Sequence, residues 1–314
     1  MYFTIRCYDI MTMVIKMNNI FCVDIGGSKL ICGALNEKGE ILDTFRAEYS
    51  KDYTIDTIIG LIKQGYEKLS GYDFCACGVA VPGLCDYTSG KWLYSPFSGL
   101  GDIPIVKIIS EITNLPTFAD NDVNISAMAE KYFGVCCDTN DFLWITVSNG
   151  IGGGLYLGGQ LYRGQNLSSG EIGHFIVEEN GRKCGCGNLG CLEAHASGAS
   201  IAAIYNEETN KNLSAKEIAD LARNGDNIAL TVWHQAGSYI GKAAAYAVNL
   251  LNIDTIVLGG GAAEAFDLLE PAATESLNKN LFKKANPNCK ILHSKPGRFA
   301  ALMGCVALVL DNQK

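Results

Sequence analysis

One local pattern occurs twice in this chain: a buried strand, a glycine-rich turn and a second strand. In the first copy, an apolar run at 20–24 meets the turn 26–29, and a strand at 30–35 follows. In the second copy, a strand at 142–147 meets a turn at 148–154, and a strand at 155–157 follows. Short apolar runs separated by glycines predict hairpins. The repeat therefore predicts two related halves, whose turns could hold a phosphate chain between their backbone N–H groups.

The rest of the chain alternates helix and strand signals. Apolar spacing predicts helices at 55–69, 105–112, 125–133 and 228–252, and a capping box at Ser214 opens another. Strands are predicted at 77–81, 117–119 and 255–258, and the last of these meets a third glycine turn followed by a helix at 262–269. The final helix, 300–310, is almost entirely apolar and must be buried. Such alternation is typical of an α/β fold.

At the first glycine turn, 26–29, neither GxxxxGK[ST] leading into a helix nor GxGxxG is present, so neither a P-loop nor a dinucleotide-binding site is indicated there. Ligands of open α/β sheets bind at the carboxyl ends of strands. Asp24, Pro82-Gly83 and Asn121-Asp122 all follow predicted strands. On local grounds, Asn121-Asp122 is also typical of a helix N-cap. Both readings remain open from these residues alone.

The segment 171–193 combines a histidine, three cysteines and a carboxylate at each end. The cysteines have the spacing Cys184-x-Cys186-x4-Cys191, and His174 precedes them. Thiolates and an imidazole are the ligands of closed, tetrahedral zinc sites. The sequence therefore predicts a structural Cys₃His zinc site, which leaves Glu171 and Glu193 available to a substrate.

Bulk properties exclude several classes of protein. The 314 residues are 48% hydrophobic and 18% charged, which indicates a globular chain rather than a disordered or fibrous one. The net charge is −8 and no long basic run occurs, so no partnership with nucleic acid is expected. There is no secretory signal and no run of 18 apolar residues. The 13 cysteines are then best interpreted as reduced thiols in the cytoplasm.

Residues 1–17 precede the first clear structural signal and contain methionines at 11, 13 and 17. They are expected to be an extension or to precede a true start at Met17. The alternative is an extra edge strand.

Seven motifs carry a resemblance to a known family: DIGGSK at 24–29, PG at 82–83, NDVN at 121–124, GIGGG at 150–154, GEIGH at 170–174, CGCGNLGCLE at 184–193 and LGGG at 258–261. Together they resemble the ROK family, which groups bacterial sugar kinases with related transcriptional repressors. GEIGH followed by CxCGxxGC is the most specific combination. The resemblance covers the chain from about residue 20 to its end.

This resemblance implies a two-domain α/β fold of the actin and hexokinase type, which is ribonuclease H-like, with a cleft between the domains. The small domain would hold 18–120, with the C-terminal helix 300–314 packed back on it. The large domain would hold 121–299 and include the zinc-binding loop. A homodimer is common in the family.

The resemblance also implies ATP-dependent phosphorylation of a hexose, with glucose as the default acceptor. Asp122 would be the general base, and Asp24 would hold Mg²⁺ through water. The sugar contacts would be Asn121, Glu171, His174 and Glu193. ATP would lie against the three turns, through Gly26, Gly27, Ser28, Lys29, Asn149, Gly150, Gly152, Gly153, Gly259, Gly260 and Gly261.

Three departures from the family pattern bear on activity and specificity. Ser28 and Asn149 stand where threonine is usual, and the segment 94–99 differs from the Pro-Asn-Leu of family glucokinases. An N-acetylmannosamine kinase is the nearest rival, followed by fructose and allose kinases. A sugar-responsive repressor is a rival of another class, and only 23 residues without a helix-turn-helix motif precede Asp24. A binding protein without turnover is disfavoured by Asp24 and Asp122.

Overall fold

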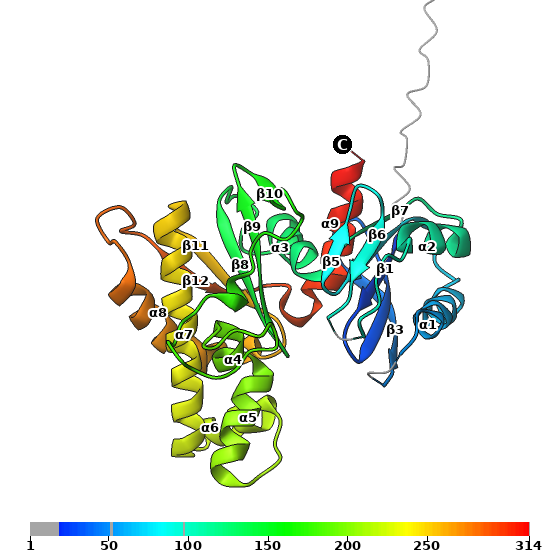
Figure 1. Ribbon diagram of the computed structural model, residues 1–314. Coiled ribbons are helices and arrows are strands. Elements are labelled where there is room, and N and C mark those ends of the chain that lie inside the picture. The colour runs from blue at the N-terminus through cyan, green and yellow to red at the C-terminus, as the bar shows by residue number, and fades with distance from the viewer. Residues whose placement is uncertain (1–18, 51–52, 97, 314) are drawn as a thin grey trace, which may run out of the picture.

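A computed structural model describes residues 19–50, 53–96 and 98–313 (Figure 1). The predicted extension and the alternative start at Met17 lie outside these residues. None of the helices in the described part of the chain combines the length and the hydropathy that a transmembrane span requires.

Two five-stranded sheets have the same topology. The first has the order β3-β2-β1-β4-β7, and the second has the order β10-β9-β8-β11-β12. In each, the first three strands in chain order are antiparallel neighbours, and the last two extend the sheet in parallel. This equivalence confirms the two related halves that the repeated glycine hairpin predicted.

The strands of the first sheet are β1 (Asn19–Ile25), β2 (Lys29–Leu35), β3 (Ile41–Glu48), β4 (Phe74–Val81) and β7 (Thr117–Asn121). The strands of the second sheet are β8 (Phe142–Val147), β9 (Ile151–Leu157), β10 (Gln160–Tyr162), β11 (Thr255–Gly259) and β12 (Lys290–His293). A separate hairpin consists of β5 (Leu84–Asp86) and β6 (Lys91–Tyr94).

The helices are α1 (Ile55–Lys68), α2 (Ile105–Thr113), α3 (Asp122–Phe133), α4 (Leu192–Ala196), α5 (Gly198–Thr209), α6 (Ala215–Arg223), α7 (Asn227–Leu251), α8 (Phe266–Asn280) and α9 (Ala300–Asn312). The short 3₁₀ segments are η1 (Ile172–His174), η2 (Ala263–Ala265) and η3 (Gly297–Phe299). The capping box predicted at Ser214 is present at the start of α6.

The helix after the last strand of each sheet packs against the other sheet. Helix α3 follows β7 but contacts β8 and β9, whereas α9 follows β12 but contacts β1, β2, β4 and β7. These two helices also pack on each other between the sheets (Figure 1). The shared core beneath them includes Cys22, Trp144 and Val306, so apolar side chains from both sheets are buried together. The predicted burial of the last helix is confirmed.

Several predicted boundaries were wrong. The turn expected at 148–154 is shorter, because β9 already begins at Ile151. Strand β7 continues through Asn121, and α3 starts directly at Asp122. The helix expected to end at 269 runs to Asn280 and contains Pro271 in its interior. Close packing of α8 on α7, where a Cβ on Gly241 would lie 2.0 Å from the Ala273 carbonyl oxygen, outweighs the local signal to stop.

Candidate active site

The first glycine turn is held in place by a tyrosine from β3's end. The turn closes through a hydrogen bond from the Gly26 N–H to the Lys29 carbonyl at 2.9 Å. The Tyr49 hydroxyl contacts the carbonyl oxygens of both residues that this hydrogen bond joins, Gly26 and Lys29. Tyr49 packs edge-on against Tyr53, whose hydroxyl lies 3.2 Å from Ser95 Oγ. Two tyrosines therefore connect this turn to the 94–96 segment, which the sequence alone did not indicate.

Asn121 caps helix α3 and orients Asp122. The Asn121 side-chain oxygen accepts from the N–H groups of Val123 and Asn124 at 2.9 and 3.1 Å. Its amide nitrogen donates to the Gly83 carbonyl at 2.8 Å and to Asp122 Oδ1 at 3.0 Å. The local expectation of an N-cap was therefore correct for Asn121. The cap also ties Asp122, at the first helical position, to the Pro82-Gly83 turn.

Two carboxyl groups at strand ends have raised pKa values. Burial raises the pKa of Asp24 to about 6, although the Lys29 charge opposes the shift. Burial and then the nearby charge of Asp24 raise the pKa of Asp122 to about 7, although the Val123 N–H and the Asn121 amide oppose the shift. The fold therefore brings the ends of β1 and β7 together. A carboxyl group that titrates near neutral pH suits general base catalysis.

The second and third glycine turns meet at the carboxyl ends of β8 and β11. The second turn closes through the Ser148 N–H and the Gly150 carbonyl at 2.9 Å. The Ala262 N–H, just after the third turn, donates to the Val147 carbonyl at 2.9 Å. Gly260 has a φ of +92°, and a Cβ there would lie 2.7 Å from Thr146 Oγ1. Glycine is needed at this position for both reasons.

The glycines of β9 serve close packing. A Cβ on Gly154 would lie 2.7 Å from Ala127 Cβ of α3, and one on Gly152 would lie 2.9 Å from Val123 Cγ2. On the opposite face, a Cβ on Gly153 would lie 2.5 Å from the Gly170 carbonyl oxygen. Gly152 and Gly153 are thus strand residues between two neighbouring segments, and Ser148 to Gly150 form the turn itself. The prediction that all the glycines of 148–154 belong to one turn was wrong.

Glycines also bring the segment 170–174 onto β9. A Cβ on Gly173 would lie 2.1 Å from the Ile151 carbonyl oxygen. Gly170 has a φ of +83° and faces the Gly153 backbone equally closely. The exposed Glu171 side chain accepts from Ser168 Oγ at 3.0 Å. His174 Nε2 lies 3.8 Å from Glu171 Oε2. Glu171 and His174, two of the four side chains predicted to contact a sugar, are therefore neighbours at one end of β9.

Glu193 links the cysteine-rich loop to the second turn. Its Oε2 accepts from the Ile151 N–H at 3.0 Å, immediately after Gly150. Its Oε1 lies 3.8 Å from Cys184 Sγ. A Cβ on Gly150 would lie 2.5 Å from Glu193 Oε2, so this glycine is required for the contact. One carboxylate thus touches both groups of predicted site residues.

The thiols and the imidazole converge at one point. Ligand atoms of His174, Cys184, Cys186 and Cys191 all lie within 4.8 Å of one another. Cys186 Sγ lies 3.6 Å from Cys191 Sγ, and His174 Nδ1 lies 3.8 Å from Cys184 Sγ. Bond lengths of about 2.3 Å to sulfur and about 2.0 Å to nitrogen would separate ligands of a tetrahedral zinc ion by about 3.5–3.8 Å. The donor set and its spacing fit zinc.

The side chains that support this loop were missed at the level of sequence. His195 Nε2 accepts from the Arg182 N–H at 3.1 Å, and burial lowers the pKa of His195. Lys242 from α7 donates to the Val177 carbonyl at 2.6 Å. The Tyr239 hydroxyl donates to Glu178 Oε2 at 3.0 Å. Only the position of His195 two residues after Glu193 could have suggested its role.

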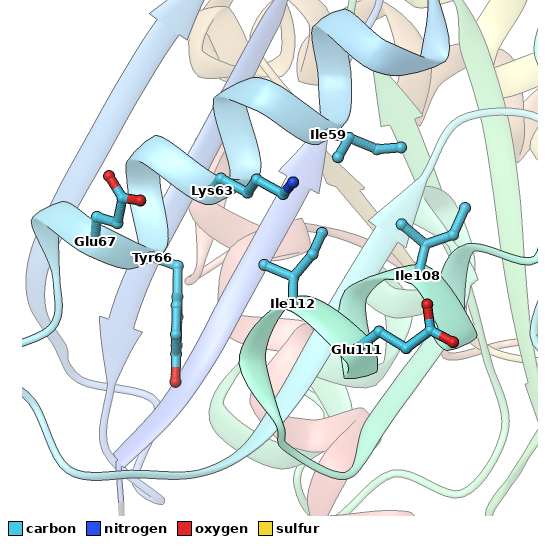
Figure 2. Close-up of a pocket in the computed structure, with 7 residues that line it drawn as sticks. All are labelled: Ile59, Lys63, Tyr66, Glu67, Ile108, Glu111 and Ile112. Atoms are coloured by element: carbon cyan, nitrogen blue, oxygen red, sulfur yellow. The ribbon is translucent and has the colours of Figure 1, made fainter.

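A groove of about 560 Å³ lies between α1 and α2, away from the predicted site (Figure 2). It is lined by Ile59, Lys63, Tyr66, Glu67, Ile108, Glu111 and Ile112. None of the residues predicted to bind a sugar, a nucleotide or a metal lines this groove. Its lining offers aliphatic side chains and opposed charges rather than converging polar groups, so it does not form part of the candidate active site.

The duplicated sheet topology and the carboxylates beside glycine turns define an α/β protein with the fold of actin and hexokinase. The family model described as "ROK family" matches residues 20–312, and the chain belongs to this family.

Solved structures and curated relatives include both kinases and repressors. A glucokinase of this family from Streptomyces griseus, solved with glucose and AMPPNP, has a TM-score of 0.85 and 27% identity, covering 95% of this chain and 100% of that one. A glucokinase from Halalkalibacterium halodurans is 34% identical over 79% of this chain and 82% of its own length. The xylose repressor of Bacillus subtilis is 31% identical over 87% of this chain and 71% of its own length.

Proposed function

We propose that this protein is a sugar kinase that transfers the γ-phosphoryl group of ATP to a hexose, with glucose as the first candidate. One observation carries the proposal. The Asp122 carboxyl group, with its pKa raised to about 7, is oriented by Asn121 and lies within electrostatic influence of Asp24 beside a glycine turn. A repressor that only binds a sugar would not need a carboxyl group tuned to accept a proton.

In the proposed reaction, Asp122 accepts the proton of the sugar hydroxyl while that oxygen forms a bond to the γ-phosphorus. The bond between the γ-phosphorus and the bridging oxygen breaks, and ADP retains that oxygen. Such transfers depend mainly on positioning and on neutralisation of charge. Asn121 positions the base, and Glu171, His174 and Glu193 pair the remaining hydroxyl groups. Hydroxyl groups that leave water without such partners would weaken binding.

The nucleotide would occupy the glycine turns. The N–H groups of the first and second turns are proposed to contact the phosphates, and Gly259 to Gly261 are proposed to lie against the adenosine. The half-buried Asp24 carboxylate suits a magnesium ion that keeps most of its waters, and the ion would neutralise phosphate charge. Ser28 and Asn149 both retain a hydrogen-bonding group, so the departures from threonine do not remove polar contacts from the turns.

We infer that His174, Cys184, Cys186 and Cys191 hold zinc, which would supply structural order to the loop that presents Glu193. Four protein ligands would complete the tetrahedral coordination of the zinc ion and leave no position for a substrate, as is typical of structural zinc sites. His174 would use Nδ1 for the metal and keep Nε2, which lies 3.8 Å from Glu171 Oε2, for a sugar hydroxyl.

The identity of the sugar depends on the loop that contains Ser95. N-acetylmannosamine, fructose and allose are the alternative acceptors. Allose differs from glucose only in the configuration at one hydroxyl-bearing carbon, so the geometry of this loop would decide between such sugars. We also infer a boundary between two domains near residue 121, a cleft between them, a homodimer, a cytoplasmic location and no nucleic-acid partner.

A sugar-responsive regulator is the second candidate function, and its support is the 31% identity to a xylose repressor.

The test is ADP release in a coupled assay over a panel of hexoses, together with sugar binding by calorimetry. We expect turnover with at least one hexose, and we expect Asp122→Asn to lower kcat by about 10³-fold or more while sugar binding persists. Asp86→Asn is the matched control, since Asp86 only accepts hydrogen bonds from Thr88 and Ser89 in its own turn. Sugar binding without ADP release in the parent protein would instead identify a regulator.

A further inference from the structure

A buried ion pair joins the two sheets at their edges. Arg163 Nε donates to Asp120 Oδ2 at 2.8 Å, and the two side chains are 17% and 1% exposed. Asp120 belongs to β7, the edge strand of the first sheet, and Arg163 directly follows β10, the edge strand of the second. The guanidinium also lies over the ring of Tyr87, 4.0 Å from its centroid, in the turn of the β5–β6 hairpin. We call Arg163, Asp120 and Tyr87 the cross-sheet clasp.

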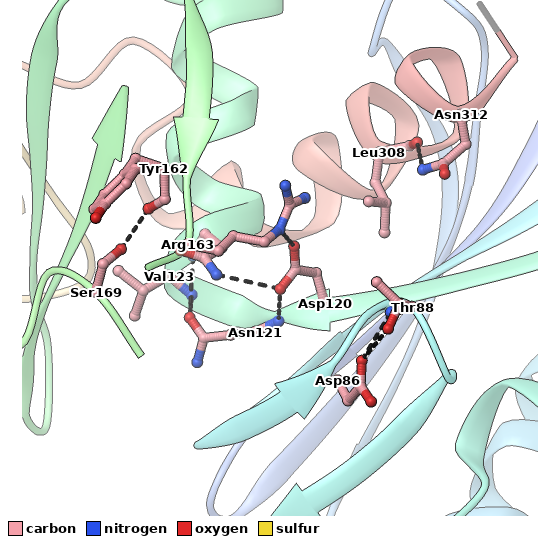
Figure 3. Close-up of polar contacts among 11 residues, drawn as sticks. Asp86, Thr88, Asp120, Asn121, Val123, Tyr162, Arg163, Ser169, Leu308 and Asn312 are labelled. Carbon is pink, nitrogen blue, oxygen red and sulfur yellow. Dashed lines mark hydrogen bonds and ion pairs between the residues drawn. The ribbon is translucent and has the colours of Figure 1, made fainter. Parts of the chain in front are cut away.

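On the first sheet, the clasp is connected to the start of α3. Asp120 Oδ1 accepts from the Asn121 N–H at 2.7 Å and from Asn124 Nδ2 at 3.2 Å. Figure 3 shows Asp120 between Arg163 and Asn121, with the remaining guanidinium nitrogens directed away from Asn121. Arg163 therefore acts on the Asp122 segment through Asp120 and does not itself face the base.

On the second sheet, the clasp is connected to the loop that carries Glu171. The Arg163 carbonyl accepts from the Ser169 N–H at 3.2 Å, and Ser169 Oγ donates to the Tyr162 carbonyl. The preceding residue, Ser168, donates through Oγ to Glu171 Oε1 at 3.0 Å. The same arginine thus closes the base of this loop with its backbone and reaches the other sheet with its side chain.

We propose that Arg163 is a positioning residue for phosphoryl transfer, which fastens the segment bearing Asp122 to the loop bearing Glu171. This inference rests on the kinase function proposed above. A buried charge pair is weak evidence for stability by itself, because desolvation of both groups opposes their attraction. The contribution of the Arg163–Asp120 pair is instead geometric. A planar guanidinium that is hydrogen-bonded to a carboxylate and stacked on an aromatic ring fixes the relative orientation of the two segments better than an apolar contact would. A misplacement of about 1 Å between base and acceptor can cost about 10²-fold in rate.

The experiment compares Arg163→Met and Arg163→Lys with Arg223→Met. Arg223 forms a comparable pair with Asp267, at 2.7 and 3.0 Å, but on the exposed surface between α6 and α8. We expect Arg163→Met to lower kcat by about 10- to 100-fold with a sugar KM within about threefold of the parent. Arg163→Lys retains the charge opposite Asp120 and should recover part of the loss. Arg223→Met should leave both constants within about twofold.

Amide hydrogen exchange provides a readout that does not depend on turnover. Arg163→Met should accelerate exchange in both 120–124 and 168–172, and Arg223→Met should accelerate it in neither. A kcat within about twofold of the parent for Arg163→Met would overturn the proposal, as would unchanged exchange in either segment. A parent protein that phosphorylates no hexose would refute the kinase function instead, and the exchange data would still decide whether the clasp couples the two segments.

Discussion

Replacement of Asp122 by asparagine should make the folded protein more stable, although it removes the proposed base. Asparagine has the same shape, and its side-chain oxygen can accept the same hydrogen bonds from the Val123 N–H and the Asn121 amide. What disappears is a carboxylate that burial and the Asp24 charge make unfavourable to ionise. The two effects of one substitution therefore have opposite signs, on activity and on stability.

The magnitude follows from the pKa. A rise from 3.8 to about 7 sets an upper limit of about 4 kcal/mol on the cost of ionisation in the folded state, at about 1.4 kcal/mol for each pKa unit. Because the side chain is only partly buried, solvent screening reduces this to about 2 kcal/mol. The folded state holds the proton more tightly than the unfolded state, so the parent protein loses stability as the pH rises from about 4 to about 7. The loss is complete above about 7.

The assay is urea unfolding of both proteins at pH 4.5 and pH 8, provided that both unfold in one transition. We expect the stability advantage of Asp122→Asn to be about 2 kcal/mol at pH 8 and much smaller at pH 4.5. Asp86→Asn is the control, and it should change the stability in the opposite direction. Hydrogen bonds from Ser89 and Thr88 lower the pKa of Asp86 to about 2, so the ionised Asp86 stabilises the folded protein. An advantage for Asp122→Asn that is absent at pH 8, or equal at both pH values, would refute the reasoning.

Three further predictions concern the glycine contact, the metal and the tyrosine pair. Gly173→Ala should destabilise the protein by about 2 kcal/mol or more in urea unfolding, because its Cβ would meet a backbone carbonyl, whereas Gly185→Ala, with open space around it, should be neutral. Chelator treatment should release one zinc ion per chain in a colorimetric assay and should abolish sugar binding. The Cys184→Ser variant should bind no zinc. Metal-free protein that keeps its full sugar affinity would contradict this prediction. Tyr53→Phe should lose the contact to Ser95, at a cost of about 1 kcal/mol in stability, and raise the sugar KM more than the ATP KM.

Residues of the candidate site were predictable where the chemistry of a short segment defines them. The spacing of three cysteines and a histidine predicted a metal site, and their ligand atoms converge within 4.8 Å. The Asp24 carboxyl group near the end of β1 and the glycine turn that follows were likewise visible in one short stretch. By contrast, His195, Lys242 and Tyr49 support the site through backbone groups. Such contacts leave no pattern in the sequence, because any donor or acceptor that the fold brings into range can make them.

The glycines also show which features a short segment predicts and which depend on the fold. The sequence indicated that glycines at 150–154 allow a tight backbone path, and for Gly150 this is correct. It could not indicate that Gly152 and Gly154 face α3 while Gly153 faces the segment around Gly170. In both cases the missing side chain permits a close approach. Only knowledge of the packed neighbour distinguishes a turn from a strand that lies under a helix.

The sequence by itself determined the repeated hairpin, most helices and strands, the helix caps and the candidate metal-binding residues, because periodicity, capping and ligand spacing act within short segments. The tertiary structure alone decided that the ends of β1 and β7 place Asp24 near Asp122, and that α3 and α9 each cross to the opposite sheet. It also decided that Arg163 meets Asp120. These contacts join segments distant in the chain, and they are selected by the burial of apolar surface over whole elements, which no local pattern specifies.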